Sequence, residues 1–256
     1  MEACKTLSFG PTIMISQSDA QFPVTRWSLI AGARDPLKRR AAVEELCTLY
    51  WRPIYGFLRR RGLAQADAQD ATQGFFVSLL DEDLFAKAAE DTGRMRSFLL
   101  GALQRWQRGE WRKSMAEKRG GGKELLSLDM LKDEEDFDAS DAETETPEHY
   151  FEKTCALQVL ENAMQRLARE QAAAGKGEAF TVLRPLLAPM PGGAAPSYEE
   201  AAQALRISAE ALRVTLHRLR KRFAEVLRDT VADTLTNPTE EAVQSELNAL
   251  RAAFSA

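Results

Sequence analysis

The sequence predicts an all-α protein, with two helical domains joined by an acidic linker and a helix-turn-helix in the C-terminal domain. Apolar residues recur at helical spacing in several segments, and no segment shows the alternation of a β-strand. Charge is also segregated. Lys+Arg less Asp+Glu gives 20 − 15 = +5 for residues 1–128, 1 − 11 = −10 for 129–152, and 12 − 9 = +3 for 153–233. The net charge of −4 therefore hides two basic blocks, which suit a nucleic-acid role.

Bulk composition limits the class of protein. A chain of 256 residues with 45% hydrophobic and 28% charged residues is typical of one or two globular domains. No apolar run is long enough to span a membrane, and the N-terminus lacks a signal-peptide pattern. The three cysteines, Cys4, Cys47 and Cys155, are scattered and odd in number. We therefore expect reduced thiols in a cytoplasmic protein, with no metal, no cofactor and no disulfide framework.

The first half of the chain begins with a weak pattern and then becomes helical. Residues 1–21 have no sustained periodicity and are predicted to be a disordered tail, followed by an N-terminal helical domain over 22–128. Ala41–Tyr50 has a helical pattern, and Pro53 is expected to kink or restart that helix. Three arginines before Gly62 form a strong helix stop.

Asp67–Leu80 is the clearest amphipathic helix of this domain. Its predicted buried face comprises Ala68, Ala71, Thr72, Phe75, Phe76 and Leu79. Asp70, Gln73, Gly74 and Val77 are predicted to point away from it. Asp67 and Asp70 lie in the first turn, where carboxylates suit the helix dipole. Two carboxylates three residues apart can also ligate Mg²⁺, but no second acidic motif or phosphate-binding loop supports that reading.

A second helix is predicted to follow a connector that ends at Gly93-Arg94-Met95-Arg96-Ser97 and to run to about Lys113, and it carries two tryptophans on different faces. Trp106 continues a core stripe with Phe98, Leu99, Ala102 and Leu103. The far side carries Gln104, Arg108, Trp111 and Arg112, with Arg105 at its edge. A tryptophan among arginines is the combination that single-stranded nucleic acid uses for base stacking and backbone neutralisation. A surface tryptophan that covers an interdomain contact is an equally good interpretation of Trp111.

The remaining segments are an acidic stretch and a second helical block. Residues 129–150 are acidic and poor in large apolar side chains, so they are predicted to form the linker. Residues 151–236 are predicted to form the C-terminal DNA-binding domain. A last helix is expected within 237–256, because Pro238 and Glu240 mark a helix start. Its predicted core face is Val243, Leu247, Leu250 and Phe254.

Ser197–Phe223 reads as two short helices joined by a tight turn. Ser197 and Glu200 form a capping box for the first helix, and Ser208 is a good N-cap for the second. The second helix has an apolar stripe of Leu212, Leu216, Leu219 and Phe223. Its opposite face carries Glu210, Val214, His217 and Lys221, flanked by Arg213 and Arg218. A helix with a buried apolar side and a free cationic side suits a DNA major groove. A solvated helix in an ordinary bundle is the alternative.

Several of these motifs, in this order, resemble an extracytoplasmic-function (ECF) sigma factor, a dissociable promoter-recognition subunit of bacterial RNA polymerase. The resemblance rests on the DAQDATQGFF helix, the basic-aromatic helix after GRMRSFLL, the linker and the helix-turn-helix, and it covers roughly residues 22–256. YWRPIYGFLRRRG, KRGGG, HRLRKRF and the NPTEEAVQSELNAL tail resemble a subgroup from planctomycete-like bacteria.

The resemblance implies a partner for each polar face. Asp67, Asp70 and Gln73 would dock on core RNA polymerase, and an anti-sigma factor or another regulator would be a further partner. Melted promoter DNA would be held by Arg96, Gln104, Arg105, Arg108, Trp111 and Arg112. The upstream duplex would be read by Ser208, Arg213, Val214, His217, Arg218 and Lys221. Such a factor has no catalytic activity of its own.

The sequence departs from the family pattern at Arg206, and a second function also fits the helix-turn-helix. Arg206 stands where the turn usually has glycine, so a left-handed backbone there would cost about 1 kcal/mol. The competing function is a freestanding helix-turn-helix regulator that binds palindromic duplex DNA as a dimer, with the first domain sensing a ligand or partner.

Overall fold

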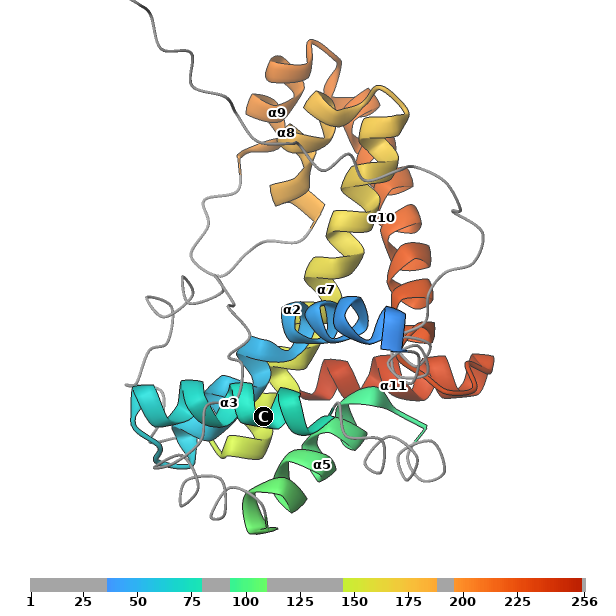
Figure 1. The fold of residues 1–256 in the computed structure, drawn as a ribbon. Helices are drawn as coiled ribbons and strands as arrows, with labels where there is room; N and C mark the ends of the chain where they lie inside the picture. The colour runs from blue at the N-terminus through green and yellow to red at the C-terminus, as the bar shows by residue number, and fades with distance from the viewer. Residues whose placement is uncertain (1–35, 80–92, 110–144, 188–195, 255–256) are drawn as a thin grey trace, which may run out of the picture.

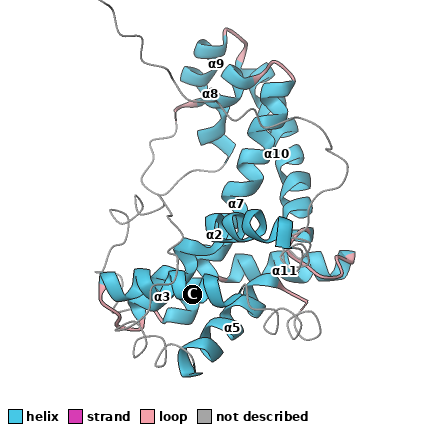
Figure 2. Cartoon of the chain, viewed as in Figure 1, coloured by secondary structure: helices cyan, strands magenta, loops and turns pink. Residues whose placement is uncertain are grey.

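The structure is a computed structural model that describes residues 36–79, 93–109, 145–187 and 196–254. Within those ranges the chain forms eight α-helices and no strand, which confirms the predicted all-α class (Figure 2). The helices are α2 (Pro36–Arg60), α3 (Gln65–Leu79), α5 (Met95–Gly109), α7 (Pro147–Ala173), α8 (Gly177–Leu187), α9 (Tyr198–Leu205), α10 (Ala209–Ala232) and α11 (Glu240–Ala252). None of these helices combines the length and the apolar character needed to cross a bilayer.

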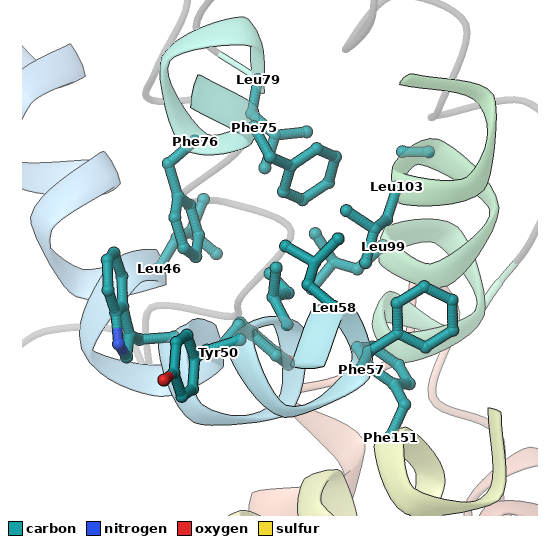
Figure 3. Close-up of a cluster of buried hydrophobic side chains, with 14 of the residues drawn as sticks. Leu46, Tyr50, Phe57, Leu58, Phe75, Phe76, Leu79, Leu99, Leu103 and Phe151 are labelled. Carbon is teal, nitrogen blue, oxygen red and sulfur yellow. The ribbon is translucent and has the colours of Figure 1, made fainter. Parts of the chain in front are cut away.

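The first hydrophobic core joins α2, α3 and α5 and is rich in aromatic rings (Figure 3). All six residues predicted to be buried in the Asp67–Leu80 helix are buried in α3. Trp106 is only 6% exposed and meets Phe75 edge-on, with ring centroids 5.9 Å apart. Its predicted core role is therefore confirmed. Gly74 was expected to face outward, but it is half-buried beside Trp106. The approach is close, since a Cβ added at Gly74 would lie 3.2 Å from the Trp106 ring.

Helix α2 is longer and more continuous than the sequence suggested. It begins at Pro36 and runs through Pro53 to Arg60 without an interruption in its helical assignment. The predicted stop is present, with Gly62 in the left-handed region at φ 88°. At Gly56 the helix passes so close to α7 that an added Cβ would lie 2.0 Å from the Tyr150 ring.

Helix α7 is shared by all the hydrophobic clusters of the described chain. Its N-cap is Thr146, with Pro147 in the first turn, so the last four residues of the predicted linker are helical. Figure 1 shows α7 running from the α2–α3–α5 bundle to α8 and α9, with α10 beside it. Phe151 and Cys155 join the first core, and Met164 and Leu167 join the core of α8, α9 and α10. The predicted boundary at residues 150/151 therefore falls inside the first turn of α7.

A smaller core joins α7 and α10 to the C-terminal helix α11. Val243 and Leu250 of α11 are buried there as predicted, and Leu247 is partly buried. Phe254 was predicted on the same face but follows the end of α11 and is 44% exposed. The residue that α11 buries instead is Glu246.

Candidate nucleic-acid interface

Helices α9 and α10 are joined by a turn whose local bonds follow from the sequence. Both capping-box bonds are present: the Ser197 amide donates to Glu200 Oε2 at 2.7 Å, and the Glu200 amide donates to Ser197 Oγ at 3.1 Å. Hydrogen bonds that the carboxyl of Glu200 receives from Ser197, from its backbone first and from its side chain second, lower the pKa of that carboxyl. Arg206 ends α9 in the left-handed region at φ 54° and ψ 42°, as its position required. That conformation costs a non-glycine residue about 1–2 kcal/mol.

Helix α10 begins at the predicted N-cap and buries the predicted stripe. Ser208 Oγ accepts a hydrogen bond from the Ala211 amide at 3.1 Å. Leu212, Leu216 and Leu219 are buried against α8 and α9, and Phe223 is partly buried beside them. The small side chain of Ala202 lies in the same core, where it lets α9 approach α10 closely. The apolar side of α10 is therefore fixed by packing.

The opposite side of α10 is solvent-exposed and basic. We call the α10 basic face the exposed set Arg213, Val214, His217, Arg218 and Lys221. Within the described ranges, no carboxylate pairs with the arginines or the lysine of this set. These positions share one face because they follow the helical spacing of three and four residues. The cations are therefore held on a rigid support and remain accessible to an anionic partner.

Two other arginines of α10 stabilise the fold. Arg220 donates to the Leu186 carbonyl at 3.1 Å and to the Tyr198 hydroxyl at 3.2 Å. Arg222 forms a two-pronged pair with Glu170 of α7, both bonds at 2.9 Å. Hydrogen bonds to Glu170 and then to Glu225 raise the pKa of Arg222 above its ordinary value. The packing thus distinguishes the arginines of α10 that are bonded within the protein, Arg220 and Arg222, from the exposed cations of the α10 basic face. The sequence pattern alone did not make this distinction.

The predicted melted-promoter residues are placed in different environments. Arg105 and Arg108 are exposed on α5. Gln104 is half-buried and donates to Glu148 of α7 at 3.3 Å. Arg96 is engaged in ion pairs described below, and Trp111 and Arg112 lie outside the described residues. On the described part of α5, the available cations are therefore Arg105 and Arg108.

An ion-pair cluster at the start of α5 was missed by sequence reasoning. Arg94 and Arg96 both reach the buried Glu246 of α11, and Arg96 also pairs with Glu152 of α7. Arg96 and Glu246 lie 150 positions apart, so no local pattern could have joined them. The sequence offered one signal, because Glu246 lies three residues after Val243 and therefore near the predicted core face of this helix. The prediction assigned Phe254 to that face and left Glu246 out.

Two of the three predicted docking residues of α3, Asp67 and Asp70, are exposed. Gln73 was predicted to point away from the core, but it is half-buried and its Oε1 is buried without a hydrogen-bond partner. Within the described ranges, no group of three or more histidine, cysteine, aspartate or glutamate side chains is placed to hold a metal ion.

Comparisons with protein-family models, with curated proteins and with solved structures gave no match.

Proposed function

We propose that this protein is a sigma factor that binds core RNA polymerase and directs promoter recognition and transcription initiation. The observation that carries the proposal is the α10 basic face, which is presented by a helix whose other side is buried against α8 and α9. In this proposal α9, its turn and α10 form a helix-turn-helix, and α10 is the recognition helix.

The dimensions and chemistry of α10 suit duplex DNA. The major groove is about 12 Å wide and admits one α-helix, whose N-terminal residues reach the base edges. Arg213 and Val214 are exposed in the first two turns of α10, so they are assigned to base edges. Lys221 lies two turns further along and is assigned to phosphate, together with the hydroxyl and amide groups at the Ser208 N-cap.

The exposed residues of the first bundle supply the other two functions of a sigma factor. Asp67, Asp70 and Gln73 of α3 are assigned to docking on core polymerase. Arg105 and Arg108 of α5, with Trp111 and Arg112 beyond it, are assigned to the melted promoter strand, where arginines neutralise phosphates and an aromatic ring stacks on a base. This assignment rests on the resemblance and on the exposure of Arg105 and Arg108.

The test is promoter binding by the complex of this protein with bacterial core polymerase, measured over a salt series on a randomised upstream element. Arg213→Ala should cost about 1–3 kcal/mol on the selected sequence and relax preference at one base pair, because arginine can donate two bonds to guanine. Lys221→Ala should weaken binding to all sequences alike and reduce the salt slope by about one, as expected for one lost phosphate contact.

Arg222→Ala is the matched control, because it removes one cation from the same helix on the side that pairs with Glu170. It should leave base preference unchanged. Unaltered base preference in Arg213→Ala and an unaltered salt slope in Lys221→Ala would together remove α10 from promoter reading. Tight binding to a palindromic duplex without polymerase would instead establish the freestanding dimeric regulator.

A further inference from the structure

The C-terminal segment of the chain is bonded to the segment that leads into α5. The Met95 amide donates to the Thr234 carbonyl at 3.1 Å, and the Thr236 amide donates to the Gly93 carbonyl at 3.0 Å. These two bonds form an isolated antiparallel bridge between Arg94 and Leu235. The backbone just after α10 is therefore paired with the backbone just before α5.

Ion pairs strengthen the same contact from α11. Arg96 donates to Glu246 through Nε at 2.6 Å and through Nη2 at 3.1 Å, which is a two-pronged geometry. Arg94 Nε lies 3.1 Å from Glu246 Oε2, the oxygen that also accepts from Arg96 Nη2, and Arg94 Nη2 donates to Ser245 Oγ at 2.9 Å. The Glu246 side chain is 2% exposed and that of Arg96 is 11% exposed. Neither group can exchange these bonds for water without local opening.

This arrangement keeps two guanidinium groups from binding phosphate. Carboxylate and phosphate accept from arginine through the same two-pronged geometry, so they compete for the same donors. With Glu246 and Glu152 in place, two arginines face two carboxylates and the cluster has no net charge. If α11 leaves, Arg94 and Arg96 face Glu152 alone, and the cluster carries a charge of +1.

We infer that the segment Thr234–Ala253 is an internal competitor for single-stranded nucleic acid at Arg94 and Arg96. With α11 in place, Glu246 occupies the arginines. With α11 displaced, the phosphates of a melted strand take the position of its carboxylate at the start of α5, the helix that also carries exposed Arg105 and Arg108. The inference rests on the proposed function, and it adds Arg94 to the strand-binding residues and a means of regulating them.

The perturbation that tests this inference is Glu246→Gln, which retains the size of the side chain and removes its charge. The matched control is Glu240→Gln on the same helix, because Glu240 is 74% exposed and pairs with Arg228 on α10 instead. Both changes remove one negative charge from α11, so a difference between them reports the local pairing and not the net charge.

The assay is fluorescence anisotropy of a labelled single-stranded oligonucleotide of mixed sequence, titrated with the full chain over a salt series. Glu246→Gln should bind the oligonucleotide about 5- to 100-fold more tightly than the wild type, the range that one coupling between two sites usually spans. Its salt slope should match that of the wild type, because the bound strand makes the same phosphate contacts in both forms and only the cost of displacing Glu246 differs. Glu240→Gln should match the wild type in both quantities.

Hydrogen exchange in the unmodified chain gives an independent measurement. The Met95 and Thr236 amides should exchange faster when the oligonucleotide is saturating, because its binding displaces the segment that protects them. Unchanged exchange at both amides in the bound state would overturn the competitor, whatever the variants do.

The outcomes separate this inference from the proposed function. If Glu246→Gln and the wild type bind the oligonucleotide equally while α10 still reads the upstream duplex with core polymerase, the competitor is refuted and the sigma factor stands. If no form of the chain binds single-stranded or duplex DNA, with or without core polymerase, both fall together.

Discussion

The close approach of α2 to α7 at Gly56 can be tested by adding one methyl group. In Gly56→Ala the new Cβ would lie 2.0 Å from Tyr150 Cε1, whereas ordinary contact begins at about 3.4 Å. The ring must therefore move by about 3.4 − 2.0 = 1.4 Å. The Arg60 guanidinium lies 3.9 Å from the centroid of that ring, so the movement also disturbs a cation–π contact.

Three terms set the expected change in the free energy of unfolding. Overpacking a tight contact costs about 1–3 kcal/mol. Loss of the cation–π contact adds about 0.5–2 kcal/mol. Alanine is a better helix former than glycine by about 1 kcal/mol, which offsets part of this cost. Because the first two terms overlap, we expect a net destabilisation of about 1–3 kcal/mol.

Urea unfolding followed by circular dichroism measures the change, and a double-mutant cycle isolates its cause. In a Tyr150→Ala background the clash is absent, so Gly56→Ala should stabilise the chain by about 1 kcal/mol. Gly101→Ala is the control within α5, since its Cβ would lie 3.8 Å from Arg105 Nη1 and meet no clash. If Gly56→Ala stabilises the native chain as Gly101→Ala does, the described contact between α2 and α7 is wrong.

Four further predictions concern Trp106, Asp70, Arg206 and Glu200. Trp106→Ala should destabilise the chain by about 3–5 kcal/mol in urea unfolding, because the ring is buried in the first core. Asp70→Arg should abolish co-purification with core polymerase while stability changes by less than about 0.5 kcal/mol; retained binding would reject the docking assignment. Arg206→Gly should raise the urea midpoint, since glycine adopts the left-handed turn without strain; a lowered midpoint would contradict this. The lowered pKa of Glu200 means that its stabilisation is present above its unfolded pKa and lost as the pH falls through its folded pKa. Glu200→Gln should therefore lack that acid-dependent component when urea midpoints are compared across pH.

The features that the sequence predicted best are local ones. The buried faces of α3 and α5 were predicted because a period of 3.6 residues is visible within one helix. The capping box at Ser197 was predicted because it depends on residues within one turn. The left-handed conformation of Arg206 was considered only through the family resemblance, in which that position usually has glycine. The α10 basic face was found in the same way, since opposite sides of one helix are separated by the same periodicity.

The features that the sequence did not predict depend on distant contacts or on competing signals. The pairing of Glu246 with Arg94 and Arg96 requires α11 to lie against the start of α5, which no pattern within either segment specifies. The early start of α7 had a local signal, because Thr146 is a good N-cap and Pro147 suits the first turn. The acidic composition around these residues outweighed that signal.

The continuity of α7 has a geometric consequence for the two surfaces that the proposed function assigns to DNA, the α10 basic face and the exposed arginines of α5. Its 27 residues, at about 1.5 Å each, form a helix about 40 Å long, which enters the α2–α3–α5 core near its start and the α8–α9–α10 core further along. At about 3.4 Å per base pair, that length corresponds to about 12 base pairs of duplex. A single unbroken helix thus acts as a spacer of fixed length. A protein that uses both surfaces at once would accept only promoters whose upstream element and melted start region are separated by a narrow range of distances.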